Sequence, residues 1–202
     1  MPTPITLLLA LLPVVGLAAE AGDIACSAQI TMQPQPSEGA QRALVDGDKT
    51  TASSFEVGTE GEGSFTFTFD HPRQVSGLRL LQGGDVYYST ELSVEADLDG
   101  DGELETPLAE LSDAPLREWA AANWEPVSLR SLRLRSTAGV SNGRRAHPCL
   151  AEVQIIGVRE ADDMRKAAEA GIALATLPVA RPLERVTRLV SSGQAPALMA
   201  PE

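Results

Sequence analysis

The chain has 202 residues, a formal net charge of −12 at pH 7 and two cysteines. Such an excess of acid opposes binding to the phosphates of nucleic acids and to anionic membranes, so the sequence predicts no nucleic-acid partner. The length allows one well-cored domain of roughly 130 residues followed by a tail.

Residues 1–21 have the features of a secretory signal peptide. The apolar run from Ile5 to Ala18 is too short to span a bilayer, and Ala19-Glu20-Ala21 offers an A-x-A cleavage site. A buried N-terminal helix is the alternative, because no Lys or Arg precedes the apolar run. No other segment approaches membrane-spanning length, so we expect no membrane span and a secreted or periplasmic protein.

The two cysteines stand at opposite ends of the predicted domain, Cys26 after the leader and Cys149 before the last strand. In an oxidising compartment an even pair favours a disulfide, which would tie the first residues of the domain to its last strand. Two free, buried thiols are the alternative. Neither C-x-x-C nor zinc-ligand spacing is present, which argues against redox catalysis and a zinc site.

An acidic glycine turn, Asp46-Gly47-Asp48, follows an apolar step at Leu44 and Val45. Much later in the chain, the segment Cys149–Gly157 has the pattern of a strand and carries one carboxylate, Glu152. We interpret the two segments as the two ends of one domain that meet at a single site. The simplest alternative is a type I turn in which Asp46 and Asp48 cap their own backbone.

Apolar and polar residues alternate with a period of two at residues 64–69, 75–81, 91–96 and 132–135. The first of these segments places three phenylalanines on one face. Pro and Gly interrupt the pattern, for example at His71-Pro72, where we expect a turn. The spacing favours an all-β fold, an antiparallel sandwich, over alternating βα units. Residues 116–124 are compatible with a short helix or an irregular edge.

A second acidic segment, Asp97 to Glu105, begins like the calcium loop of an EF-hand. Oxygen-bearing side chains stand at positions one, three and five and glycine at position six, but position twelve is Leu108 instead of the bidentate Glu. A glycine hairpin between two strands is therefore the favoured interpretation. A weak site completed by Glu103 or Glu105 is the alternative.

After Gly157 the composition changes to that of a helix, from Glu160 to Leu174, and Pro178 and Pro182 then interrupt it. We therefore divide the chain into a signal peptide at 1–21, a β-domain at 22–157, and a helix with a flexible tail at 158–202. A helix that docks on a partner protein is the alternative to a loosely attached extension.

These features together resemble a known family. The turn at residues 45–51, the early sheet, the leucine and arginine strand and the closing segment 152–157 are similar to the galactose-binding-like jelly rolls, which include discoidin, or F5/8 type C, modules and bacterial carbohydrate-binding relatives. Gly61-Glu62-Gly63 before the Phe-rich strand, with Cys149 before the closing strand, most resembles the glycan-binding domain of NADase-type toxins. The resemblance covers Cys26 to Gly157 and implies a jelly-roll β-sandwich.

The resemblance implies a structural Ca²⁺ in the Asp-Gly-Asp turn, completed by the carboxylate of the last strand. Carried over residue by residue, its ligands would be Asp46, Asp48, Thr51 and Glu152. The chemistry agrees, because Ca²⁺ takes six to eight hard oxygens and such a turn offers carboxylates and carbonyls close together.

The resemblance also places ligand recognition in loops at one rim of the sandwich. The polar loop at residues 141–147 is our candidate, since its side chains can hydrogen-bond to vicinal hydroxyls; they are Asn142, Arg144, Arg145 and His147. An aromatic ring normally covers the apolar face of a sugar, and Tyr87, Tyr88, Trp119 and Trp124 are available. We expect Trp124 to pack in the core. The alternative is that both tryptophans pack and the arginines are solvated.

The sequence contains no sign of an enzyme. It has two histidines, His71 and His147, and lacks G-x-S-x-G, H-E-x-x-H and a Gly-rich phosphate loop. We therefore expect a non-catalytic binding module for carbohydrate or a similar surface ligand. The alternative is a structural or protein-interaction domain of the cell envelope that makes its contact through the C-terminal helix.

Overall fold

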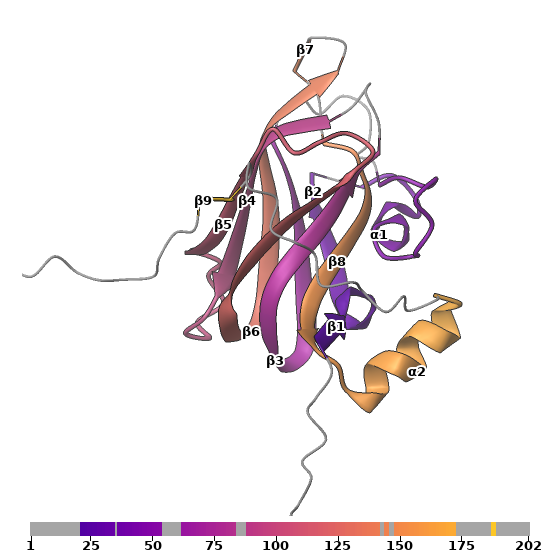
Figure 1. Ribbon diagram of the computed structural model, residues 1–202, viewed down its shortest axis with the longest axis vertical. Coiled ribbons are helices and arrows are strands. Elements are labelled where there is room, and N and C mark those ends of the chain that lie inside the picture. The colour runs from indigo at the N-terminus through magenta and orange to yellow at the C-terminus, as the bar shows by residue number, and fades with distance from the viewer. Residues whose placement is uncertain are drawn as a thin grey trace, which may run out of the picture.

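Figure 1 shows the computed structural model of the chain, which describes residues 21–34, 36–53, 62–83, 88–141, 144–145, 148–172 and 187–188. The helical elements are η1 (Ala25–Ser27), α1 (Ala40–Ala43) and α2 (Ala161–Ala170). The strands are β1 (Ala21–Asp23), β2 (Gln29–Gln33), β3 (Gly63–Gln82), β4 (Tyr88–Asp97), β5 (Thr106–Ser112), β6 (Trp119–Ser141), β7 (Arg144–Arg145), β8 (Leu150–Val158) and β9 (Thr187–Arg188).

The named strands pair antiparallel, and the two longest, β3 and β6, take part in both layers of the sandwich. In its first half β3 lies between β2 and the second half of β6, with Phe67 opposite both Ile30 and Leu132. In its second half it lies between β8 and the first half of β6, with Leu80 opposite Val153 and Ala120. Strands β4 and β5 extend the first layer and β1 extends the second. This arrangement confirms the predicted antiparallel sandwich.

The turn predicted at His71-Pro72 is wrong, because both residues lie inside β3. The register between β3 and β6 shifts between Thr68 and Arg73, and Asp70, His71 and Pro72 in this stretch are exposed. Proline has no N–H to donate to a ladder, so it is tolerated where the strand bulges. The bulge bends β3 from one layer into the other, and the two predicted strands are halves of one.

The core is made of the inward faces of both layers. The three phenylalanines of β3, Phe65, Phe67 and Phe69, are buried on the face that the alternation predicted. They join the leucines of β6 and the apolar residues of β8 in one hydrophobic cluster. Each buried aromatic ring removes about 150–250 Å² from water, so this face supplies a large share of the driving force for folding.

Helix α2 confirms the predicted C-terminal helix and ends earlier than expected. It begins at a capping box between Glu160 and Asp163 and ends at Gly171, whose φ of 71° stops the helix. It packs beside η1, and Figure 1 shows it at the lower end of the sandwich. Of the predicted tail, β9 is described and pairs with β5.

The predicted disulfide between Cys26 and Cys149 is absent, and both cysteines are free, half-buried thiols. Ile24, two residues before Cys26, donates its N–H to Ile155 O, far along β8 from Cys149. The six residue steps from 149 to 155 span about 20 Å of strand, whereas a disulfide needs Cα atoms less than about 7 Å apart. The pairing of β1 with the distal end of β8 thus keeps the thiols apart.

Residues 1–20, the greater part of the predicted signal peptide, lie outside the described residues, and Ala21 begins β1. Within the part of the chain that the structure describes, no helix is both long and apolar enough to cross a bilayer.

Candidate functional site

The acidic turn at residues 46–51 is held together by its own side chains. Asp46 Oδ1 accepts a hydrogen bond from Asp48 N at 2.8 Å, and Asp48 Oδ1 accepts one from Thr50 N at 2.9 Å. Thr51 Oγ1 lies 3.0 Å from Asp46 Oδ2 and 2.8 Å from the carbonyl oxygen of Asp48. Gly47 has a φ of 76°, a conformation that glycine adopts without strain. The turn therefore contains the self-capping that sequence analysis offered as the alternative to a metal site.

Glu152 joins this turn to β8, as the sequence predicted. Its Oε2 accepts a hydrogen bond from Gly47 N at 3.2 Å, and the neighbouring Val153 N donates to Leu44 O at 2.7 Å. The side chain of Glu152 is only 3 % exposed. We call the turn at residues 46–51 together with Glu152 the clasp. It brings the four residues predicted to bind calcium into one region.

The clasp has an unbalanced negative charge. Burial, with the nearby carboxylates of Asp23, Asp46 and Asp48, raises the pKa of Glu152 to about 8. Burial also raises the pKa of Asp23 to about 6, against the hydrogen bonds that its carboxylate accepts. Repulsion from the nearby carboxylates makes ionisation of Glu152 harder, and a bound cation would relieve it.

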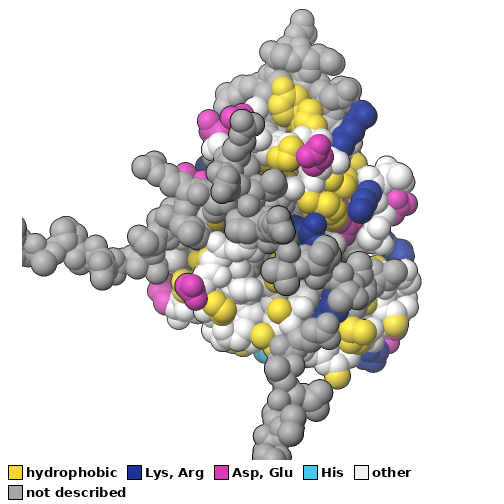
Figure 2. Space-filling view, in the orientation of Figure 1, with side chains coloured by type: hydrophobic (Ala, Val, Ile, Leu, Met, Phe, Trp, Pro, Cys, Tyr) yellow, Lys and Arg dark blue, Asp and Glu magenta, His cyan; other side chains and the backbone are white. Residues whose placement is uncertain are grey.

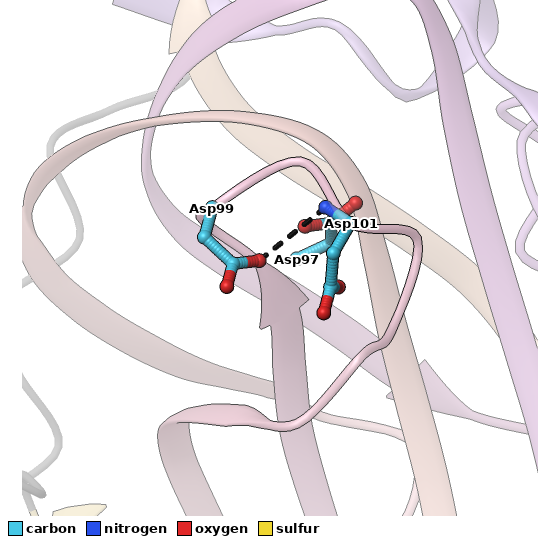
Figure 3. Close-up of side chains that lie close together, drawn as sticks. All are labelled: Asp97, Asp99 and Asp101. Atoms are coloured by element: carbon cyan, nitrogen blue, oxygen red, sulfur yellow. Dashed lines mark hydrogen bonds between the residues drawn. The ribbon is translucent and has the colours of Figure 1, made fainter.

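Within the described residues, the acidic side chains whose oxygens converge within 4.8 Å are Asp97, Asp99 and Asp101, not those of the clasp. Figure 3 shows these three on the loop between β4 and β5. Asp97 accepts hydrogen bonds from the N–H groups of Gly100 and Gly102, both at positive φ. The loop is therefore a glycine hairpin between β4 and β5 in which three carboxylates lie close together. Leu108, at the position of the EF-hand glutamate, is buried in the core and offers no oxygen.

The predicted ligand loop is described in part. Arg144 and Arg145 form β7, which pairs with the end of β6, so the loop is a hairpin. Asn142 and His147 lie outside the described residues. Figure 1 shows β7 at the upper end of the sandwich, opposite the end that carries α2.

A hollow beside the clasp was not predicted from the sequence. Its volume is about 380 Å³, and we call it the Trp119 pocket; its lining residues are Lys49, Thr50, Leu81, Gln82, Gly83, Arg117 and Trp119. Leu81 on β3 stands opposite Trp119 on β6 and opposite Glu152 on β8. Since cross-strand partners share a face of the sheet, the clasp and the pocket are neighbours on the outer face of one layer.

Two cations contact the ring of Trp119. The Cζ atom of Arg79 lies 4.7 Å from the ring centroid and Nζ of Lys49 lies 5.8 Å from it, both within the range of cation–π attraction. Trp119 is half-buried, so part of its ring remains accessible. Trp124 instead donates its Nε1–H to Val75 O at 3.1 Å and packs against the core, as predicted.

The sequence held only a weak signal for this pocket. Trp119 was among the rings considered, but the strand pairing that brings Lys49, Leu81 and Arg117 to it depends on register between distant segments. Residues 116–124, left undecided between helix and edge, contain a bridge from Leu116 to Gln82 and the start of β6. On the face drawn in Figure 2, Lys and Arg side chains lie beside hydrophobic ones near α1.

No protein-family model matches the sequence, and no curated protein matches it. The structure nevertheless resembles solved carbohydrate-binding modules. A mutant of chitosan-binding module 1 from a chitosanase/glucanase of Paenibacillus sp. IK-5 has a TM-score of 0.56 at 16 % identity, over 68 % of this chain and 100 % of that one. The family 32 module of Clostridium perfringens NanJ, solved with galactose, has a TM-score of 0.55 at 15 % identity, over 68 % and 99 % of the two chains.

A third similar structure is the family 32 module of AlyQ in complex with 4,5-unsaturated mannuronic acid, with a TM-score of 0.50 at 18 % identity, over 63 % and 92 % of the two chains. The chain has the galactose-binding-like β-sandwich fold. The resemblance inferred from the acidic turn and the closing strand is thereby confirmed at the level of the fold. In this galactose-binding-like sandwich, the clasp and the Trp119 pocket form one continuous region on the outer face.

Proposed function

We propose that this protein is a non-catalytic carbohydrate-binding module that acts outside the cytoplasm. The observation that carries the proposal is the Trp119 pocket, in which an accessible aromatic ring and several hydrogen-bond donors lie together on a galactose-binding-like sandwich. Similar structures are complexes with galactose, chitotriose and an unsaturated mannuronic acid. A saccharide is the ligand class that both observations support.

The pocket has the chemistry that sugar binding needs. The indole ring of Trp119 offers an apolar surface for the C–H face of a pyranose, and Lys49 and Thr50 offer polar groups for its hydroxyls. Glycoside hydrolysis generally requires a pair of carboxyl groups flanking the bond, and the described residues that line this pocket include no carboxylate. The lining therefore favours binding over hydrolysis.

We also propose that the clasp holds a structural Ca²⁺. The residues offer the hard oxygens that such an ion needs, and Glu152 is buried near other carboxylates and accepts one hydrogen bond, from Gly47. Asp46, Asp48, Thr51 and Glu152 would hold it, with backbone carbonyls of the turn completing the oxygen set. A cation here would neutralise the clasp and fix Lys49, which belongs to the same turn, at the edge of the pocket.

The test is a glycan array on the full chain, followed by calorimetry with the best ligand. Trp119→Ala should abolish binding while leaving the melting temperature within a few degrees, because Trp119 lines the surface and not the core. The double change Arg144→Ala and Arg145→Ala tests the β7 hairpin as a second contact. Absence of binding to any glycan by the folded protein would refute the proposed function.

Calcium binding is tested separately by calorimetry and by thermal unfolding with and without the ion. We expect Ca²⁺ to raise the melting temperature of the wild type and to have no effect on Asp46→Ala. Asp101→Ala is the matched control for the β4–β5 loop and should retain the calcium effect. If calcium produces neither a heat of binding nor a higher melting temperature, the clasp binds no calcium and is held by its hydrogen bonds alone.

The alternative function, a protein contact through α2, has one observation in its favour. Met164 on α2 is 52 % exposed, one of two large apolar side chains exposed among the described residues. The buried residues of α2, Asp163 and Ala167, pack on its own domain beside Met164. Met164→Glu leaves those contacts intact, so loss of a partner on this change alone would support the alternative.

A further inference from the structure

The buried side chain of Gln82 joins segments that meet beside the Trp119 pocket. Gln82 is the last residue of β3 and is only 1 % exposed. Its Oε1 accepts a hydrogen bond from Ser89 N at 2.6 Å, and its Nε2 donates to Ser89 O at 3.0 Å and to Ala114 O at 2.8 Å. Both donors of the amide and its oxygen are therefore engaged by the backbone. This side chain acts on the protein and not directly on a ligand.

The first segment that Gln82 holds is the start of β4. The register between β4 and β6 shifts between Ser89 and Glu91, so the ladder is irregular where Gln82 binds. The amide supplies a partner for both backbone groups of Ser89, as a neighbouring strand does in a regular sheet. The hydroxyl of Ser89 lies 2.8 Å from that of Ser136 on β6, and both serines are buried. The start of β4 is thus fixed to the end of β3.

The second segment is the connection between β5 and β6, which has a strained backbone. Asp113 and Arg117 have φ values of 52° and 60°, and in the described chain they are the two non-glycine residues with positive φ. Such a conformation is unfavourable and persists where surrounding contacts fix the chain. Two contacts of this kind come from Gln82, whose amide binds Ala114 O and whose backbone forms a parallel bridge with Leu116. Gln82 therefore holds the connection between its two strained residues.

This connection leads directly into the Trp119 pocket. Trp119 begins β6 two residues after Arg117, and both residues line the pocket. Gly83, which follows Gln82, also lines it, and Leu81, which precedes Gln82, stands opposite Trp119. The strand that faces Trp119 and the connection that precedes it are thus joined through the amide of one residue.

We propose that Gln82 is a positioning residue of the Trp119 pocket. This rests on the proposed function, which assigns the pocket to saccharide binding. The amide of Gln82 keeps the strained connection against the end of β3 and so places the ring of Trp119 before a saccharide arrives. A surface that is ordered in advance loses less conformational entropy on binding. Gln82 thereby raises the affinity without contacting the sugar.

The chemistry of the position requires an amide. Methionine has a similar length, but it would leave Ser89 N, Ser89 O and Ala114 O without the partners that Gln82 provides. Glutamate would still accept from Ser89 N, but its negative charge would face two carbonyl oxygens. Gln82→Met is therefore the sharpest variant, because it removes the hydrogen bonds, adds no charge and nearly keeps the volume of the side chain.

The emission of Trp119 reports the position of its ring without any ligand. The chain has two tryptophans, so in Trp124→Phe the emission comes from Trp119 alone. We expect acrylamide to quench this emission more strongly when Gln82→Met is added, because the ring is no longer held in place. Equal quenching with and without Gln82→Met would overturn the proposal.

Saccharide binding is measured by calorimetry on the full chain, with galactose and chitotriose as probes. We expect Gln82→Met to weaken binding about tenfold, because the connection must then be ordered when the saccharide binds. Arg133→Met is the matched control. It removes hydrogen bonds to Glu95 and to Leu104 O on the outer face of the first layer, away from the pocket. Both variants should have lower melting temperatures than the wild type, but only Gln82→Met should change quenching and affinity.

The outcomes separate this inference from the proposed function. A saccharide that binds equally well to the wild type and to Gln82→Met would overturn the positioning role and leave the carbohydrate-binding function intact. Equal weakening by Gln82→Met and Arg133→Met would also overturn it, since the effect would then follow from lost stability. If neither probe nor any glycan of the array binds, the proposed function fails, and the quenching of Trp119 still decides whether Gln82 places the ring.

Discussion

Glu152 and Trp119 stand on either side of Leu81, one on each neighbouring strand of the same layer. The buried carboxylate of the clasp and the accessible ring of the pocket are therefore separated by the width of one strand. Lys49 belongs to the acidic turn and reaches the ring of Trp119. Any change that loosens the turn will therefore displace Lys49 from the ring of Trp119. The clasp thus has a supporting role in recognition.

The buried carboxylate of Glu152 predicts a pH-dependent stability in the absence of calcium. Its pKa is about 8 in the folded chain and near the ordinary 4.5 when unfolded, so the protonated form is favoured by folding. Stability from this group is complete below about pH 4.5 and is lost as the pH rises to about 8. Glu152→Gln keeps an acceptor for Gly47 N and stays neutral. In EDTA, it should be more stable than the wild type by at least about 1 kcal/mol at pH 9 and equal to it at pH 4.

Urea unfolding across this pH range measures the difference. Glu110→Gln, which neutralises an exposed carboxylate on β5, is the control and should follow the wild type at every pH. If the Glu152→Gln difference is the same at pH 4 and at pH 9, the carboxylate is not the titrating group. With calcium the order should reverse above pH 8, because only the wild type retains the carboxylate ligand.

The sequence predicted the sandwich because alternation and turn residues are local signals. That Phe65 and Leu134 face the core follows from the period-two alternation of their strands. That Asp46 lies near Glu152 follows from the resemblance of their segments to the galactose-binding-like family. Contacts set by register, such as Trp119 against Leu81 and Arg79, have no local signal. The predicted disulfide was wrong for the same reason. Cys26 and Cys149 are near the two ends of the domain in sequence, but Cys149 precedes the first residue of β8 and Cys26 follows a segment that pairs with the other end of β8.

A buried ion pair fixes α2 to the sandwich. Asp163 is 1 % exposed and binds Arg73, which is 4 % exposed, through two hydrogen bonds of 2.6 and 3.0 Å; Ser27 and Glu160 N donate to the same carboxylate. Asp163→Asn removes the charge that binds Arg73 and leaves the half-exposed Glu160 as its ion-pair partner. We expect a loss of about 1.5–3 kcal/mol in the free energy of unfolding, the range for hydrogen bonds to charged groups, measured by urea titration.

Asp162→Asn provides the matched control for that change. Asp162 is the adjacent residue, with an exposed side chain that pairs with Arg165 on the surface of α2. Removing one partner of an exposed pair should cost less than about 1 kcal/mol. Similar losses for both variants would mean that α2 is not anchored through Arg73.

The free thiols predict that the fold does not depend on oxidation. Burial raises the pKa of both Cys26 and Cys149, so neither forms the reactive thiolate readily near neutral pH. We expect two thiols to react with Ellman's reagent after denaturation and slow reaction before it. The double variant Cys26→Ser and Cys149→Ser should melt within about 3 °C of the wild type with or without reductant. A melting temperature that falls on reduction of the wild type alone would reveal a stabilising disulfide.

The two tryptophans of the chain allow the pocket and the core to be observed separately by fluorescence. Trp119 contacts Lys49 and Arg79 at the pocket, whereas Trp124 donates a hydrogen bond to Val75 and packs against the core. A saccharide that covers the indole of Trp119 should change its emission.

Trp124→Phe should retain this ligand-dependent change and lose about 1–2 kcal/mol of stability, because the Val75 carbonyl loses its donor. Trp119→Phe should lose the ligand-dependent change and keep its stability within about 1 kcal/mol, since its ring lies on the outer face of the sheet. A ligand-dependent change that follows Trp124 instead would place the binding surface away from the pocket.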